Sequence, residues 1–180
     1  IPVVNPTVNI AASKGTTICN GQSDSFTAMI TYGGSSPAFV WNLNGAYAGV
    51  GNTFVYTPTH NDYLTVTLTS NEICAVPNVI TDGVLMTVKD NIIPTVVVNT
   101  YPGPNIINGT METLTAVIVN GGVSPTFQWY VNGVLVAGAT SASFSSNSFH
   151  DMDTVTCKVI GCASTPGQSS VILRVIPRAG

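Results

Sequence analysis

The chain contains 180 residues with a net charge of −3; 44% of its side chains are hydrophobic and only 7% are charged. Five basic residues do not supply the basic patch of a nucleic-acid-binding protein, and no apolar run approaches the roughly eighteen residues of a membrane span. We therefore expect a folded chain with neutral, hydroxyl-rich surfaces that neither binds nucleic acid nor inserts into a membrane. The lack of a recognisable signal peptide is expected of a mature or excised chain.

An internal repeat divides the chain. Gly33–Gly45 (GGSSPAFVWNLNG) returns as Gly121–Gly133 (GGVSPTFQWYVNG), with eight of thirteen positions identical at an offset of 88 residues. The offset is close to half the chain length, so the sequence predicts two tandem domains, residues 1–91 and 92–180.

Short segments of alternating apolar residues recur about every ten residues in both copies, separated by Gly, Asn and Pro turns. This spacing indicates a β-sandwich or barrel, and no long segment has the period of about 3.6 residues that marks a helix. The first copy carries the pattern at Val8/Ile10, Ser25–Tyr32, Phe39–Leu43, Phe54–Tyr56, Asp62–Ser70 and Val84–Val88, and the second copy carries it at Val96/Val98, Thr113–Asn120, Phe127–Val131, Ala142–Phe144, Asp151–Val159 and Val171–Val175.

The repeated motif supplies the centre of each predicted domain. Trp41 and Trp129 lie in alternation on the third strand, as expected for core residues between two sheets. The strand then ends at Asn-Gly, a strong signal for a two-residue hairpin turn. The sequence therefore predicts an all-β protein of two tandem immunoglobulin-like β-sandwich domains with about seven strands each.

The four cysteines are Cys19, Cys74, Cys157 and Cys162. An even number in small Thr-rich domains favours disulfides and an oxidising compartment, and three connectivities are possible. Cys74 and Cys162 share the repeat offset of 88, whereas Cys157 falls where the first copy has Leu68. The simplest proposal keeps each bridge within one domain, as Cys19–Cys74 and Cys157–Cys162, which peptide mapping without reduction would test.

Few residues point to chemistry. Asp151 and Asp153 could contribute to a Ca²⁺ site, although no D-x-D-x-D-G loop is present and a polar turn is the alternative. His60 and His150 each precede an acid, but no G-x-S-x-G elbow supplies a nucleophile, so both are expected in surface loops. We expect no catalytic residues, no metal ligands and no cofactor.

Exposed aromatic side chains would be needed for sugar stacking. The candidate tyrosines form no repeated row, which gives weak support to a flat binding platform. Asn108-Gly109-Thr110 matches a glycosylation acceptor, a triplet that is common by chance in a chain rich in Asn and Thr. The tyrosines expected to be exposed are Tyr47, Tyr63, Tyr101 and Tyr130.

The complete pattern resembles the Ig-like or PKD-like repeats of Bacteroidota surface and secreted proteins. The motif G-G-x-x-P-x-F-x-W-x-x-N-G carries this resemblance, preceded by I-C-N-G-Q-S and followed by T-V-T-x-x-x-S-N-x-x-C. The second copy departs from the pattern by lacking the early cysteine, since Ile107 stands at that position. The resemblance implies a sandwich fold, export and a spacer or adhesive role, but no particular ligand.

The sequence favours a non-enzymatic structural or adhesive spacer at the cell surface or outside the cell, with other repeats of the same parent chain as its partners. One alternative is a polysaccharide-binding accessory module of a secreted hydrolase. Another is a self-associating subunit of an extracellular fibre or sheath, in which a strand edge pairs with a neighbouring subunit.

Overall fold

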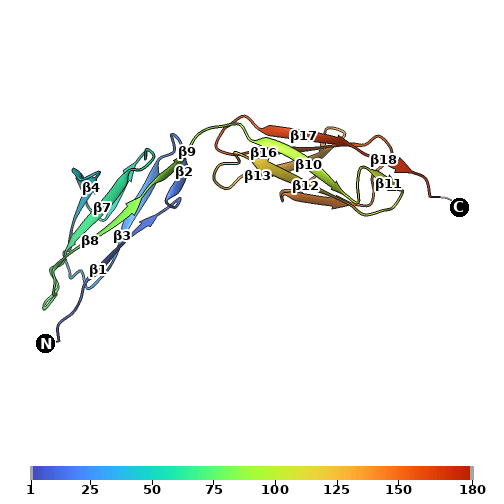
Figure 1. Ribbon diagram of the computed structural model, residues 1–180. Coiled ribbons are helices and arrows are strands. Elements are labelled where there is room, and N and C mark those ends of the chain that lie inside the picture. The colour runs from blue at the N-terminus through green and yellow to red at the C-terminus, as the bar shows by residue number, and fades with distance from the viewer. Residues whose placement is uncertain (1, 179–180) are drawn as a thin grey trace. The chain divides into compact units, whose positions relative to one another are not determined.

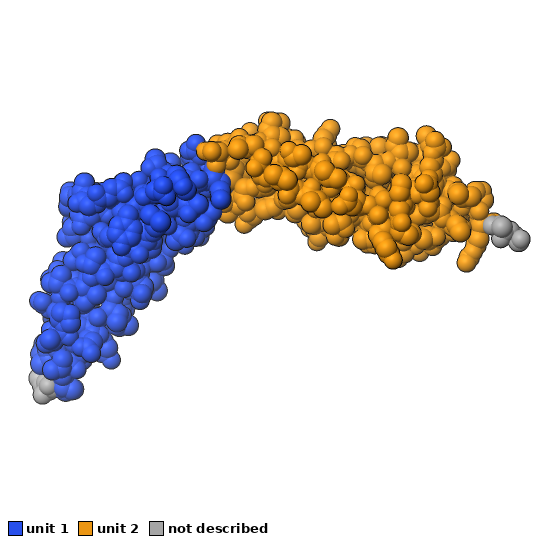
Figure 2. Space-filling model, viewed as in Figure 1, with its two compact units in different colours: residues 1–89 blue, residues 90–180 orange. Residues whose placement is uncertain are grey.

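The computed structural model describes residues 2–178 and contains two compact units, residues 1–89 and 90–180 (Figure 2). All regular structure in the described residues is β-strand, as the sequence predicts. Within residues 2–178 we find no helix that is long and apolar enough to cross a membrane.

Unit 1 is a sandwich of a three-stranded and a four-stranded sheet, with strand orders β1-β3-β6 and β5-β4-β7-β8. A parallel pair, β2 with β9, closes one end (Figure 1). The strands are β1 (Thr7–Ala12), β2 (Thr17–Cys19), β3 (Asp24–Thr31), β4 (Ala38–Leu43), β5 (Ala46–Val50), β6 (Thr53–Tyr56), β7 (Tyr63–Thr69), β8 (Val79–Leu85) and β9 (Thr87–Lys89).

Unit 2 repeats this arrangement, with sheets β10-β12-β15 and β14-β13-β16-β17 and the parallel pair β11 with β18. The strands are β10 (Thr95–Tyr101), β11 (Asn105–Ile107), β12 (Glu112–Val119), β13 (Thr126–Val131), β14 (Val134–Leu135), β15 (Ser143–Ser146), β16 (Thr154–Ile160), β17 (Gly167–Ile172) and β18 (Arg174–Ile176). The additional strands, compared with the seven expected, are short segments at sheet edges and at the closed end of each unit.

Alternation places apolar side chains between the two sheets of each unit. In β7, for example, Leu64, Val66 and Leu68 are fully buried while the threonines between them face outward. β-branched residues pack well on such a pleated surface, which explains why these Thr-Val repeats form strands.

Each unit has its own core around one tryptophan. Trp41 is fully buried, donates from its indole N–H to the Gly51 carbonyl at 2.8 Å, and stacks on Phe54 with ring centroids 5.8 Å apart. Trp129 is also fully buried and donates to the Ser141 carbonyl at 2.9 Å. Burying a side chain that hides 150–250 Å² contributes roughly 4–6 kcal/mol before conformational entropy is counted.

Candidate functional site

The Asn-Gly end of the repeated motif is held by a buried aspartate. Asn44 donates from its side-chain amide to Asp62 at 2.9 Å, and its own side-chain oxygen accepts the Tyr63 N–H at 2.8 Å. Asn44 and Gly45 both have positive φ angles, 53° and 81°, as a tight hairpin turn requires. The turn is therefore locked to the chain that enters β7.

Unit 2 contains the same lock. Asn132 donates to Asp153 at 2.7 Å and accepts the Thr154 N–H at 2.9 Å, while the His150 N–H donates to Asp153 at 2.8 Å. The repeated motif thus has a structural purpose: its final asparagine fixes the hairpin to a buried acid.

The two acids considered as Ca²⁺ ligands have separate structural partners. Asp153 is 7% exposed and its oxygens accept the bonds of the lock, whereas Asp151 accepts the Val175 N–H at 3.1 Å. No group of three or more His, Cys, Asp or Glu side chains in the described part of the chain is arranged to hold a metal ion.

The acid of the first lock has a shifted pKa. Burial of Asp62 would raise its pKa, but hydrogen bonds from the Thr59 backbone and from the Asn44 and Thr59 side chains together lower it below the usual value. Its carboxylate is therefore ionised across the neutral range and keeps its charge-assisted bonds.

The histidines lie close to backbone or carboxylate groups. His60 accepts the Val88 N–H at 3.2 Å through Nδ1, and the largely exposed His150 places Nδ1 3.8 Å from Asp153 Oδ2. The His60 contact joins its loop to β9, whereas His150 and Asp153 lie three residues apart in one loop. Both positions fit the expectation of surface loops.

The expected disulfide pairing is wrong. Cys74 is an exposed free thiol and Cys157 is a buried free thiol, whereas Cys19 and Cys162 are both disulfide-bonded. Neither Cys19–Cys74 nor Cys157–Cys162 is therefore formed.

The dimensions of unit 1 explain why Cys19 and Cys74 do not meet. Cys19 pairs with Lys89 at the end of β9, whereas Cys74 lies in the loop before β8 begins at Val79. Ten extended residues separate Val79 from Lys89, about 33 Å at about 3.3 Å per residue. A disulfide needs Cα atoms within about 7 Å, so opposite ends of one sandwich cannot be bridged.

The residue of unit 1 that corresponds to Cys157 differs from the one expected. Cys157 lies opposite Trp129 in the strand pairing, as Val66 lies opposite Trp41, so Cys157 corresponds to Val66 and not to Leu68. Burial raises the pKa of the Cys157 thiol to about 11. It therefore behaves as a small core residue, and the strand carries it about 10 Å from Ile160, away from Cys162.

Cys74 and Cys162 are likewise not equivalent. Cys74 lies five residues beyond the end of β7 at Thr69, and Cys162 lies two residues beyond the end of β16 at Ile160. The segment before β16 is longer than its counterpart in unit 1, and the loop after β16 is shorter. The two differences in length cancel, so Cys74 and Cys162 are 88 residues apart by coincidence.

Sequence reasoning did not single out a second buried acid in each unit. Asp24 and Glu112 begin β3 and β12, share the repeat offset, and are 2% and 0% exposed. Asp24 accepts bonds from the Ser13 hydroxyl, from the Lys14 N–H and from the Ser25 N–H. Equal spacing from the tryptophans was the available signal, because both acids precede the motif by the same number of residues.

The carboxylate of Glu112 has no hydrogen-bond partner of good geometry at either oxygen. Burial raises its pKa, and the nearby backbone of Gly103 and of Tyr101 only partly opposes that shift. Pro102 stands where unit 1 has Lys14 and lacks the N–H that Lys14 donates. Unit 2 therefore buries an acid without the donors that unit 1 supplies.

The tyrosines divide by exposure. Tyr101 is 78% exposed, Tyr47 is 70% exposed and Tyr63 is 48% exposed, whereas Tyr130 is partly buried beneath Lys158, whose Nζ lies 4.8 Å from the ring centroid. Tyr47 and Tyr63 lie on the outward face of the four-stranded sheet of unit 1, and Tyr101 lies on β10 of unit 2.

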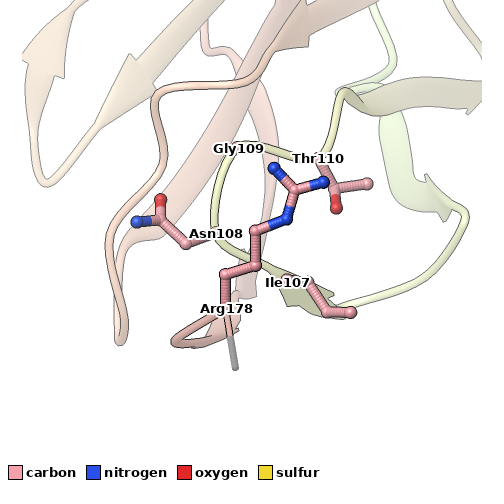
Figure 3. Close-up of a pocket in the computed structure, with 5 residues that line it drawn as sticks. All are labelled: Ile107, Asn108, Gly109, Thr110 and Arg178. Carbon is pink, nitrogen blue, oxygen red and sulfur yellow. The ribbon is translucent and has the colours of Figure 1, made fainter. Parts of the chain in front are cut away.

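A pocket of about 350 Å³ lies at the closed end of unit 2, where β11 pairs with β18. Figure 3 shows the Arg178 side chain extending along the turn from Asn108 to Thr110, which with Ile107 forms the lining. A smaller pocket beside it shares Asn108 and includes His150 and Asp151. The five residues that line the larger pocket include no histidine, cysteine, aspartate or glutamate.

No protein-family model and no curated protein sequence matches the chain. Solved structures match its fold: the fibronectin(III)-like modules of Clostridium thermocellum CbhA are 14% identical with a TM-score of 0.56, over 95% of this chain and 95% of that one. The three N-terminal domains of the bacteriophage RB49 Highly Immunogenic Outer Capsid protein (Hoc) are 14% identical with a TM-score of 0.53. That match covers 94% of this chain and 59% of the Hoc chain.

The ectodomain of mouse nectin-like molecule 4, described as Ig1–Ig3, is 12% identical with a TM-score of 0.42, over 98% of this chain and 65% of that one. At these identities the likenesses above a TM-score of 0.5 show the fold alone. The chain shares the fold of the fibronectin(III)-like modules of CbhA and of the N-terminal domains of Hoc.

Proposed function

We propose that the chain is a non-catalytic spacer and adhesive module of an exported bacterial surface protein, in the manner of the tandem repeats of Bacteroidota surface proteins. Two self-contained cores, each around one buried tryptophan, support this role, as does the fold shared with tandem modules. Disulfide-bonded Cys19 and Cys162 support an oxidising compartment outside the cytoplasm.

The observation that carries the proposal is the parallel pairing of an early and the last strand in each unit. In unit 1 the Thr87 N–H donates to the Thr16 carbonyl at 2.8 Å, and the Asn20 N–H donates to the Lys89 carbonyl at 2.9 Å. In unit 2 the Arg174 N–H donates to the Pro104 carbonyl at 2.7 Å. These bonds flank the ladders β2–β9 and β11–β18.

Parallel pairing matters because of the direction in which force would act. Tension on the chain pulls β2 towards its N-terminal side and β9 towards its C-terminal side, so the two strands slide past each other. The ladder bonds lie across the strands and are loaded together rather than one after another. A unit closed in this way resists extension, which is the property that a load-bearing spacer needs.

Single-molecule force measurements on the two-unit chain test this role. With a thiol reductant present to open the disulfide bonds of Cys19 and Cys162, we expect two unfolding events, each lengthening the chain by roughly 300 Å, since about 90 residues extend by at most about 3.3–3.6 Å each. Arg174→Pro removes one donor of the β11–β18 closure and should lower the unfolding force of one event, while the intact unit 1 serves as the control in the same molecule.

Two results would contradict the spacer proposal. One is that the unsubstituted chain extends without unfolding peaks, as an unfolded chain does. The other is an Arg174→Pro chain that remains folded and unfolds at two unchanged forces, because the parallel closure would then carry no load.

A further inference from the structure

One outward sheet face in unit 1 carries no charged side chain in its central patch and has an aromatic side chain on β5 and another on β7. It belongs to the sheet β5-β4-β7-β8, and we call this patch the tyrosine face. Its residues alternate with the buried ones, so their side chains point away from the core. The tyrosine face is the central patch of this outward face, and the exposed apolar side chains of Val40, Val50, Val79 and Leu85 border it. It consists of Tyr47, Asn42, Thr65, Tyr63, Gly83, Thr67 and Thr81.

Strand pairing places its central row in register. Tyr47 lies opposite Asn42, Asn42 lies opposite Thr65, and Thr65 lies opposite Gly83. Neighbouring strands are about 4.8 Å apart, so the row spans roughly 14 Å from β5 to β8. This length accommodates a short segment of a linear polymer.

Gly83 leaves the space that the Tyr63 ring occupies on the sheet. A Cβ at this position would collide with the hydroxyl and Cζ of Tyr63, so the Tyr63 ring lies over the backbone that glycine leaves bare. The ring is 48% exposed and therefore rests against the sheet while still meeting solvent. Packing against a strand glycine holds the ring in place.

The polar groups beside the two tyrosine rings are neutral. The Thr67 and Thr81 hydroxyls are 2.9 Å apart, and the Thr65 hydroxyl donates to the Asn42 carbonyl at 3.4 Å. The nearest acid along β8 is Asp82, which alternates to the other side and accepts the Ile10 N–H at 2.8 Å. The tyrosine face offers hydroxyl and amide groups without a net charge.

Unit 2 has a different surface at the same positions. Its corresponding row is Leu135, Tyr130, Thr156 and Ser170. The single tyrosine of this row is covered by the Lys158 ammonium group, and its hydroxyl donates to Gln128 at 3.0 Å. The two open tyrosines and the glycine are therefore specific to unit 1.

We propose that the tyrosine face is a binding site for a neutral polysaccharide. Pyranose rings have apolar C–H faces that stack on exposed aromatic rings, while their hydroxyls exchange hydrogen bonds with threonine and asparagine. An uncharged face matches an uncharged polymer because no ionic group has to be desolvated without a partner. This site goes beyond the spacer role and does not depend on it.

Retention of the two-unit chain on insoluble polymers tests the site. The probes are cellulose, chitin and xylan as neutral polymers, with alginate as an anionic comparison. We expect retention on at least one neutral polymer and about a tenfold loss of affinity for Tyr47→Ala. Tyr101→Ala is the control, because it removes a tyrosine that is 78% exposed on the three-stranded sheet of unit 2. This variant should bind as the unsubstituted chain does.

A second variant, Gly83→Ser, introduces the unit 2 residue and displaces the Tyr63 ring, so binding should fall as it does for Tyr47→Ala. Circular dichroism confirms that the variants compared are folded. The proposal is overturned by no retention on any neutral polymer, by retention on alginate alone, or by unchanged binding of folded Tyr47→Ala. Tyr47→Ala leaves β2–β9 intact, so the force measurement and the binding measurement can fail independently.

Discussion

Asp24 in unit 1 and Glu112 in unit 2 begin equivalent strands and are equally buried, yet their surroundings differ. Asp24 accepts bonds from Ser13, Lys14 and Ser25, whereas both oxygens of Glu112 are without a partner of good geometry. Burying a polar group stabilises a fold only when its hydrogen bonds are made. A repeat can therefore keep the position of a buried acid while losing side-chain and backbone donors that bind it in the other copy.

The largest expected effect is the removal of the satisfied acid. Asp24→Ala leaves the Lys14 N–H and the Ser13 hydroxyl without their acceptor, which should destabilise unit 1 by about 2–3 kcal/mol. Hydrogen exchange with mass spectrometry, followed through denaturant, reports each unit separately in the intact chain. Loss of protection in unit 2 instead of unit 1, or no loss at all, would contradict a stabilising role of the Asp24 hydrogen bonds.

The opposite change is expected for the unsatisfied acid. Glu112→Gln removes a buried charge that the backbone of Gly103 and of Tyr101 stabilises only in part, and it should stabilise unit 2 by about 1 kcal/mol at neutral pH. The same exchange measurement applies, with unit 1 as the internal reference. Destabilisation of unit 2 would mean that the carboxylate makes essential contacts when ionised.

In the unsubstituted chain, the stability of unit 2 should depend on pH because of Glu112. The pKa of Glu112 is raised above 4.5, so the folded state takes up a proton first and unit 2 gains stability as the pH falls from 7 towards 4.5. That gain is lost again as the pH rises through the folded pKa, and Glu112→Gln should abolish it.

Unit 1 responds in the other direction and at lower pH. The pKa of Asp62 is lowered below 3.8, so its contribution is present above that value and is lost as the pH falls through the folded pKa. A parent chain in which unit 2 weakens on acidification from pH 7 to 4.5, with no change in unit 1, would contradict this assignment for Glu112.

The smallest effect concerns the residues beside the tryptophans. Cys157→Val introduces the residue that unit 1 has at Val66 and should change the stability of unit 2 by less than about 1 kcal/mol. In the parent chain a thiol reagent should modify Cys74 at once and Cys157 only after unfolding, because Cys157 is fully buried with a raised pKa. Two rapid modifications in the native chain would show that the core position is accessible.

Local patterns were sufficient to predict most of the architecture. Alternation around Phe39, Trp41 and Leu43 gave the strand and its inward face, and Asn44-Gly45 gave the turn. These features depend on the two-residue period of a strand and on the φ angles of a few residues, both of which act over short distances. The edge strand β5 was not predicted, since Ala46–Val50 has no clear alternation and depends on pairing with β4.

The candidate sites were harder to derive, because they combine residues from different strands. Tyr47 and Tyr63 do not form a row in the sequence, but strand pairing places them on one face, and Gly83 explains the position of one ring. The sequence did not show that the hydrogen bonding of Asp24 differs from that of Glu112, because the donors come from another loop.

The duplication, the all-β sandwich class and the two core tryptophans follow from the amino-acid pattern, because periodicity and turn chemistry are local properties. Which cysteines are oxidised became visible in the folded structure, since a longer segment before β16 and a shorter loop after it give Cys74 and Cys162 the repeat offset although they are not equivalent. The same holds for which buried acid accepts hydrogen bonds and for which tyrosines share a surface. Those outcomes depend on strand register and loop length, which bring together groups that are far apart along the chain.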